Sequence, residues 1–120
     1  MDDSIKMYIF INTDLNMNAG KIASQTGHIV HRIVDELVRS GYEVHPPSNE
    51  YITYARWSRN CTKIILKATH EQLEFLMKLP NARHFIDSGP TTQVAQNSLT
   101  VVGFFPGTDL GDIVKDYKLL

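Results

Sequence analysis

Short aliphatic runs alternate with amphipathic segments along this chain, and this alternation constrains its fold more than any other feature. Residues 7–11, Met-Tyr-Ile-Phe-Ile, form a continuous apolar run that is typical of a strand buried on both faces. From 19 to 40, apolar side chains instead recur at three- and four-residue steps, which predicts a helix that ends at Gly41. Strands that alternate with helices indicate a sheet with helices on both of its faces.

Three further helices are expected from capping residues. Ser48 is placed to N-cap a short helix that reaches Trp57, which we interpret as a packing anchor. Thr69 and Gln72 form a capping box at the start of another helix. A last helix is expected over residues 109–116.

Three further strands are expected at 63–67, 84–86 and 99–105. No helical segment separates the last two strands, so this pair is predicted to be antiparallel and the sheet mixed. The predicted fold class is therefore α/β. We expect a single three-layer domain over residues 1–120, with a small, mixed, mostly four-stranded sheet and helices on both faces.

Composition excludes several classes of protein. A single cysteine, Cys61, rules out an internal disulfide and a multi-cysteine zinc site, and no histidine pair has a third ligand nearby in the sequence, so no metal is expected. No apolar run approaches the roughly 20 residues that span a bilayer, so no membrane association is expected. The start lacks a signal-peptide pattern, which predicts a cytoplasmic location. With 12 basic and 13 acidic residues, the chain needs a local patch to bind nucleic acid.

A polar stripe runs along the predicted helix at 19–40. At about 100° per residue, Lys21, Gln25, His28 and Arg32 fall within one narrow arc. One interpretation is an ordinary solvated helix face. The other is a functional site, because a lysine in the first turn opposes the helix dipole and gains nothing from that position.

Polar residues also follow the predicted strands, where sites gather in open α/β sheets. This edge is predicted to collect Asp14, the loop to Gly20, Lys21 and Asp87. Asp87 could equally cap a turn. Hydroxyl side chains that ordinarily bond within turns surround the same loop, at Thr91, Thr92, Ser98 and Thr100.

Four blocks of sequence occur in an order that resembles one known family. They are residues 13–28 (TDLNMNAGKIASQTGH), Trp57 with 61–68 (CTKIILKA), 85–95 (FIDSG followed by TQVA) and 100–107 (TVVGFFPG). With this order and spacing, the chain resembles the archaeal/eukaryotic-type peptidyl-tRNA hydrolases from about residue 6 to its end.

The resemblance implies an enzyme that hydrolyses the ester bond between a peptide and the 3′ end of tRNA, releasing both. It implies no cofactor, peptidyl-tRNA as the partner, and a homodimer as one expected state. By position, it implies a catalytic set of Lys21, Gln25, Asp87, Thr92 and Thr100, with Thr91 as the alternative to Thr92 because this loop has one extra residue. We expect the substrate to contact Asp14, Gly20, His28, Arg32, Thr91 and Ser98.

The residue types fit ester hydrolysis, which needs a placed water, a stabilised oxyanion and a proton for the leaving oxygen. Our hypothesis is that Asp87 orients or deprotonates the water. Lys21 offers its charge to the oxyanion or to the terminal phosphate, and Gln25 with a loop threonine orients the ester. If Lys21 and Asp87 approach each other, the aspartate becomes a poor base and water orientation is its expected role.

The chain departs from the family pattern where positive charge is expected. Ala19 stands at the position of a lysine, and Pro90 and Thr91 occupy the place of an arginine. Because phosphate contacts supply salt-dependent affinity, weaker tRNA binding is expected. The alternative interpretation is a catalytically weak or inactive module that binds tRNA or a protein on the same fold. A hydrolase for another ester or amide is a third.

Overall fold

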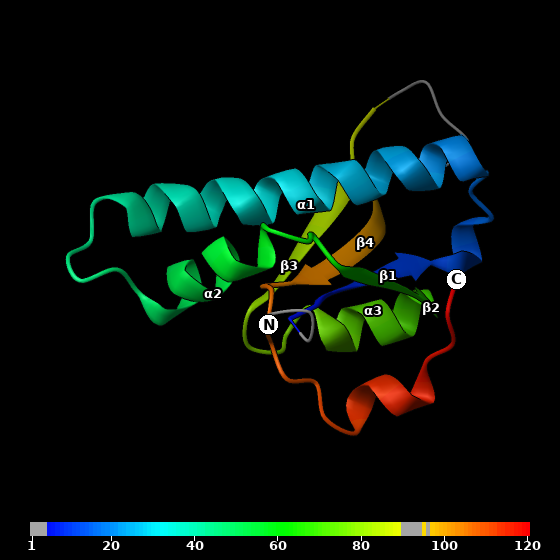
Figure 1. Ribbon diagram of the computed structural model, residues 1–120. Helices are drawn as coiled ribbons and strands as arrows, with labels where there is room; N and C mark the ends of the chain where they lie inside the picture. The colour runs from blue at the N-terminus through cyan, green and yellow to red at the C-terminus, as the bar shows by residue number, and fades with distance from the viewer. Residues whose placement is uncertain (1–4, 90–94, 96) are drawn as a thin grey trace.

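The computed structural model describes residues 5–89, 95 and 97–120, and it is built on a four-stranded sheet with the order β2-β1-β4-β3 (Figure 1). The strands are β1 (Met7–Asn12), β2 (Lys63–Ala68), β3 (Ala82–Asp87) and β4 (Ser98–Phe104). β1 and β2 are parallel, whereas β4 is antiparallel to both β1 and β3. The mixed sheet and the antiparallel last pair are therefore confirmed. The carboxyl ends of β1, β2 and β3 meet the start of β4 at one edge.

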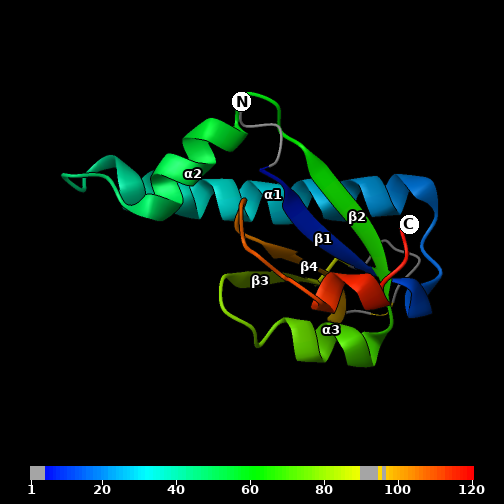
Figure 2. The ribbon, with the colours of Figure 1, turned by 60° about the horizontal axis from the view of Figure 1, so that its bottom comes forward.

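Helices cover both faces of this sheet, as predicted (Figure 2). They are α1 (Ala19–Tyr42), α2 (Asn49–Trp57), α3 (His70–Leu76) and the short 3-10 helices η1 (Thr13–Leu15) and η2 (Ile113–Asp116). Side chains of α1 and α2 pack on one face, and those of α3 and η2 pack on the other. Within the described ranges, no helix is long and apolar enough to cross a bilayer.

The central strand β1 supplies side chains to two separate cores. Ile9 and Ile11 join the cluster under α1, where they pack with Ile29, while Phe10 joins the cluster under α3 with Leu73. Successive strand residues point to opposite faces. A strand covered on both faces must therefore be apolar at every position, which explains the unbroken run at 7–11.

Three of the four predicted helix starts are present. The side chain of Asn18 accepts a hydrogen bond from the Lys21 amide at 2.9 Å and caps α1, a cap that the sequence analysis did not identify. Ser48 caps α2 through the Tyr51 amide, as expected. The capping box of Thr69 opens α3 as predicted.

Trp57 ends α2 as a packing anchor. Its side chain is 3% exposed, and its indole N–H donates to the carbonyl of Thr62 at 2.7 Å. This contact ties the end of α2 to the chain that enters β2.

Gly41 does not end α1, which continues to Tyr42. A Cβ atom at Gly41 would lie 2.3 Å from Cδ2 of Tyr51 on α2. This glycine therefore allows two helices to approach each other. A glycine at this position is typical of a helix end, but a close contact between two helices also requires a glycine. The local pattern does not distinguish these two cases.

The last predicted helix is wrong in type and extent. Residues 109–112 are not helical, and only the 3-10 helix η2 forms, with no side-chain cap at Asp112. The Thr108 hydroxyl donates instead to the carbonyl of Phe105 at 2.7 Å, within the turn that follows β4.

Candidate active site

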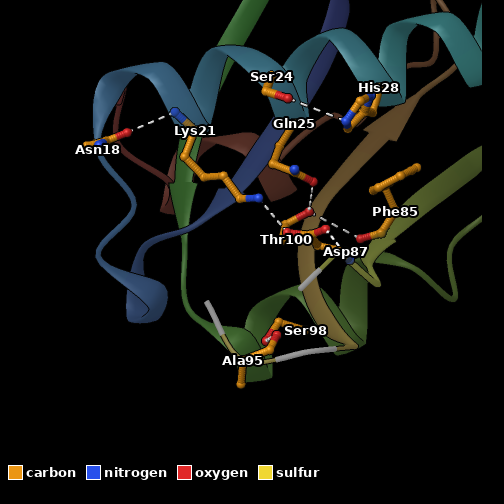
Figure 3. A network of polar contacts seen from close by, with 11 residues as sticks. Asn18, Lys21, Ser24, Gln25, His28, Phe85, Asp87, Ala95, Ser98 and Thr100 are labelled. Atoms are coloured by element: carbon orange, nitrogen blue, oxygen red, sulfur yellow. Dashed lines mark hydrogen bonds and ion pairs between the residues drawn. The ribbon is translucent and has the colours of Figure 1, made fainter. Parts of the chain in front are cut away.

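Lys21 and Asp87 form an ion pair at the edge of the sheet (Figure 3). Lys21 lies in the first turn of α1, and Asp87 is the last residue of β3. The Lys21 Nζ atom is 2.5 Å from Asp87 Oδ2, and the two side chains are only 14% and 10% exposed. The fold thus joins residues far apart in sequence in a largely water-shielded contact.

This environment keeps Asp87 ionised. The hydrogen bond from Lys21 is the main cause that lowers the pKa of the Asp87 carboxyl below its ordinary value. The Gly89 amide, 3.0 Å from Oδ1, and the charges of Lys21 and His28 lower the pKa further, while burial opposes them. At neutral pH, Asp87 is therefore an acceptor of hydrogen bonds and a weak base.

Gln25 and Thr100 form a buried polar pair beside this ion pair (Figure 3). Gln25 is 1% exposed and Thr100 is fully buried. The Thr100 hydroxyl lies 2.6 Å from Gln25 Oε1 and 3.3 Å from the carbonyl oxygen of Phe85. A hydroxyl has one proton, so the shorter contact is the main hydrogen bond. Because Gln25 Oε1 accepts this hydrogen bond, the Gln25 side chain keeps its amide nitrogen as a hydrogen-bond donor.

A β-bulge brings Thr100 into the site. Phe85 pairs with Val101 and Ile86 pairs with Leu99, so Thr100 is an extra residue on β4. Val102 and Leu99 both lie in the core under α3, which breaks the strict alternation of the strand. A bulge redirects side chains in this way. Thr100 therefore reaches α1, where regular pairing would have pointed it to the opposite face.

The remaining half of the polar stripe lies over β3. The His28 ring stacks on Phe85 with centroids 4.7 Å apart and planes inclined by 29°. Arg32 Cζ lies 4.8 Å from the centroid of the same Phe85 ring, and Arg32 donates to the His84 carbonyl at 2.8 Å.

The stripe is therefore not a simple solvated face. Its first two members, Lys21 and Gln25, are shielded from water and bound to the sheet, while His28 and Arg32 are exposed. The arrangement supplies a carboxylate, an ammonium group, an amide and a hydroxyl within one constellation. These are the groups that orient water and stabilise an oxyanion.

Comparison with known proteins covers almost the whole chain. The family described as peptidyl-tRNA hydrolase PTH2 matches residues 5–120. The chain belongs to this family.

The matches to curated relatives cover nearly all of this chain and nearly all of each relative. The chain is 31% identical to the peptidyl-tRNA hydrolase of Sulfolobus acidocaldarius, covering 97% of this chain and 100% of that protein. It is 29% identical to that of Metallosphaera sedula, with the same coverage. It is 28% identical to that of Staphylothermus marinus, covering 96% of this chain and 94% of that protein.

In the described part of this peptidyl-tRNA hydrolase family member, three predicted substrate-contact residues form no hydrogen bond with the side chains of the ion pair or of the polar pair, although Ser98 is paired with Asp87 across the sheet. Asp14 accepts a hydrogen bond from the His70 amide at 2.9 Å, at the start of α3. The Ser98 hydroxyl donates to the Ala95 carbonyl at 2.6 Å. Gly20 has no positive φ, and a Cβ there would make only an ordinary contact. These contacts serve the fold, and a substrate role stays a prediction.

Two predicted residues, Thr91 and Thr92, lie outside the residues that the structure describes. Within the described ranges, no group of three or more histidine, cysteine, aspartate or glutamate side chains is arranged to hold a metal ion.

Three contributors to the site were missed by the sequence analysis. Phe85 carries the ring under His28, and Gly89 donates its amide to Asp87. Asn12, 1% exposed, donates to the Leu99 carbonyl at 2.8 Å and joins the end of β1 to the start of β4. Asn12 had a detectable signal, because it is a polar residue directly after a buried strand. Phe85 had none, since its pattern is that of an ordinary strand residue.

Proposed function

We propose that this chain hydrolyses the ester that joins a peptide to the 3′ ribose of tRNA, and that the shielded Lys21–Asp87 ion pair is the centre of the reaction. The single observation that carries this assignment is the pairing of these two side chains, in a member of the peptidyl-tRNA hydrolase family, beside the buried Gln25–Thr100 pair.

In this mechanism, a water molecule attacks the ester carbonyl. Asp87 accepts a hydrogen bond from that water and aligns it, because a carboxylate has about four acceptor positions and the Lys21 and Gly89 contacts occupy two. As the carbon–oxygen bond to the ribose breaks, the attacking water loses a proton and the ribose oxygen gains one.

Lys21 supplies positive charge where negative charge develops. An ammonium group held in a water-poor site stabilises an oxyanion strongly, because it does not need to reorient during the reaction. The partner carboxylate keeps Lys21 in place. Gln25, fixed by Thr100, orients the ester through its amide nitrogen.

Asp87 acts here by orientation and not as a strong general base. Its pKa is lowered mainly by the Lys21 hydrogen bond, so its affinity for a proton is below that of a free aspartate. The homodimer and the cytoplasmic location expected from the sequence stay predictions, the first to be tested by the mass of the protein in solution.

The decisive experiment measures release of peptide from N-blocked aminoacyl-tRNA by the purified chain. Lys21→Ala and Asp87→Ala should each reduce kcat on the order of 10²–10³-fold, which is the cost of removing one preorganised electrostatic group. Lys78→Ala and Asp112→Asn are matched controls on the exposed surface, and their activity should equal that of the unaltered chain.

Two outcomes would contradict the assignment. Losses below tenfold in both Lys21→Ala and Asp87→Ala, with both variants folded, would remove the ion pair from the mechanism. An unaltered chain that binds tRNA without turnover would favour the non-catalytic binding module.

A further inference from the structure

A second cluster extends from the ion pair along α1. It comprises His28, Arg32 and Phe85, and we call it the ring cluster. Phe85 is half-buried on β3, whereas His28 and Arg32 are exposed on α1. One face of the His28 ring rests on Phe85, so the opposite face is directed outward as a flat surface. The catalytic proposal uses none of these three side chains.

Arg32 holds the uncompensated positive charge of this cluster. Its hydrogen bond goes to a neutral group, the His84 carbonyl, and within the described residues it contacts no carboxylate. Arg83 differs, because its Nε and one terminal nitrogen donate to the two carboxylate oxygens of Glu36, each at 2.6 Å. The charge of Arg83 is thus neutralised, and that of Arg32 is available to an anion.

The ring cluster lies at a short distance from the reacting centre. His28 follows Gln25 by three residues, which corresponds to about 4.5 Å along the axis of α1. It follows Lys21 by seven residues, or about 10 Å. A nucleoside whose 3′ oxygen is at the ion pair therefore brings its base within reach of the His28 ring.

We propose that the ring cluster binds the 3′-terminal nucleotide of the tRNA, with the base stacked on His28 and a backbone phosphate held by Arg32. This inference rests on the proposed function, since it extends the same site toward the tRNA portion of the substrate. An outward-facing ring beside an unneutralised guanidinium matches a nucleotide, which always carries both a base and a phosphate. The peptide portion varies in sequence between substrates, so it does not always offer a flat ring and an anion at the same places.

Binding of short RNA hairpins tests the base contact without requiring turnover. One hairpin ends in a single-stranded 3′ adenosine, and its match has an abasic 3′ residue. The unaltered chain should bind the adenosine-ended hairpin roughly five-fold or more tightly, because stacking on a protein ring contributes on that order per base. Fluorescence anisotropy of labelled hairpins gives both affinities.

Three variants identify the ring that is responsible. His28→Ala should bind both hairpins equally, and His28→Phe should keep the preference because it retains a flat ring without imidazole chemistry. His31→Ala is the matched control, since His31 is exposed on the same helix and has no ring contact within the described residues. It should keep the full preference.

Arg32→Gln tests the phosphate contact separately. It should weaken the binding of both hairpins to the same extent. The slope of log affinity against log salt concentration should fall by about 0.7–0.9, the change expected for one lost phosphate contact.

The inference is overturned if the unaltered chain shows no preference for the terminal base, if His28→Ala retains the preference, or if His28→Phe loses it. Failure of the proposed function has a different signature. A chain that prefers the adenosine end through His28 but releases no peptide supports the ring cluster and rejects the hydrolase. A chain that releases peptide but shows no preference for the terminal base supports the hydrolase and rejects the ring cluster.

Discussion

At the scale of single residues, Asp87 carries two roles that the sequence presented as alternatives. Its Oδ1 atom accepts from the Gly89 amide, as a turn-capping aspartate does, and its Oδ2 atom contacts Lys21. The turn bond therefore orients the same carboxylate that the ion pair holds. The turn cap and the proposed functional carboxylate are therefore both present, because each uses a different oxygen atom of Asp87.

The lowered pKa of Asp87 predicts how stability depends on pH. Its folded-state pKa lies below the unfolded value of about 3.9, so the ionised carboxylate stabilises the fold fully above that value. This contribution is lost as pH falls through the folded-state pKa. In Asp87→Asn, the free energy of unfolding should therefore decline less steeply below about pH 4 than in the unaltered chain.

Denaturant unfolding between neutral pH and about pH 2 measures this difference. Asp112→Asn is the control, because Asp112 pairs with Lys115 on the exposed surface, and it should follow the unaltered chain. Identical acid slopes for Asp87→Asn and the unaltered chain would contradict the assigned pKa shift.

Thr100 predicts a coupled loss of stability and activity. Thr100→Val keeps the shape of the side chain but leaves Gln25 Oε1 buried without its donor, which should cost about 1–3 kcal/mol. Because Gln25 is no longer fixed, kcat for peptide release should fall as well. Thr100→Ser restores the hydroxyl and should recover much of the activity, and no recovery would argue against the hydrogen bond.

At the scale of elements, the two ends of α1 have different roles, one in the proposed active site and one in packing. Its first turns carry the proposed active site, and its last turn packs on α2 through Gly41. Twenty residues separate Gly41 from Lys21, or about 30 Å along the helix axis. Packing at one end and chemistry at the other should therefore be separable.

Two glycines in α1 give opposite predictions. Gly41→Ala places a Cβ 2.3 Å from Tyr51, so forced overpacking should destabilise the fold by about 1–3 kcal/mol. Gly27→Ala meets nothing within 4 Å and replaces a poor helix former, so it should stabilise by up to about 1 kcal/mol. Thermal unfolding compares the two variants. Folded Gly41→Ala should retain normal peptide release, and a large loss of kcat would show that the two ends are coupled.

At the scale of the whole molecule, the balance of charge determines how tRNA is held. The formal net charge is −1, so long-range attraction to a polyanion is weak. Several cations are also engaged with carboxylates, among them Lys21, Arg39, Arg83 and Lys115. We therefore expect the affinity for tRNA to depend on few phosphate contacts.

The salt dependence of tRNA binding measures how many phosphate contacts the chain makes. If about two to three phosphates are bound, the slope of log affinity against log salt concentration should be only about −2 to −3. Filter binding or anisotropy over a range of salt gives this slope. A slope steeper than about −5 would contradict the weak-charge interpretation and indicate a basic surface that the present contacts do not identify.

Local signals in the sequence predicted much of the fold. The apolar run at 7–11, the caps at Ser48 and Thr69 and the antiparallel last pair are all present. These features depend on residues close together in the chain. The expected stop at Gly41 shows where a local signal fails, because the close approach of α2 explains that glycine instead. Of the helix expected at 109–116, only the 3-10 helix η2 forms.

The sequence by itself determined the alternation of strands and helices and the family to which the chain belongs. It also determined that Lys21 and Asp87 would share one edge of the sheet, because the direction of the strands places both there. Only the tertiary structure decided that they form an ion pair, that a bulge turns Thr100 toward Gln25, and that Phe85 supports His28. Periodicity places a residue on a face, whereas contact across elements depends on the register between strands that are distant in sequence.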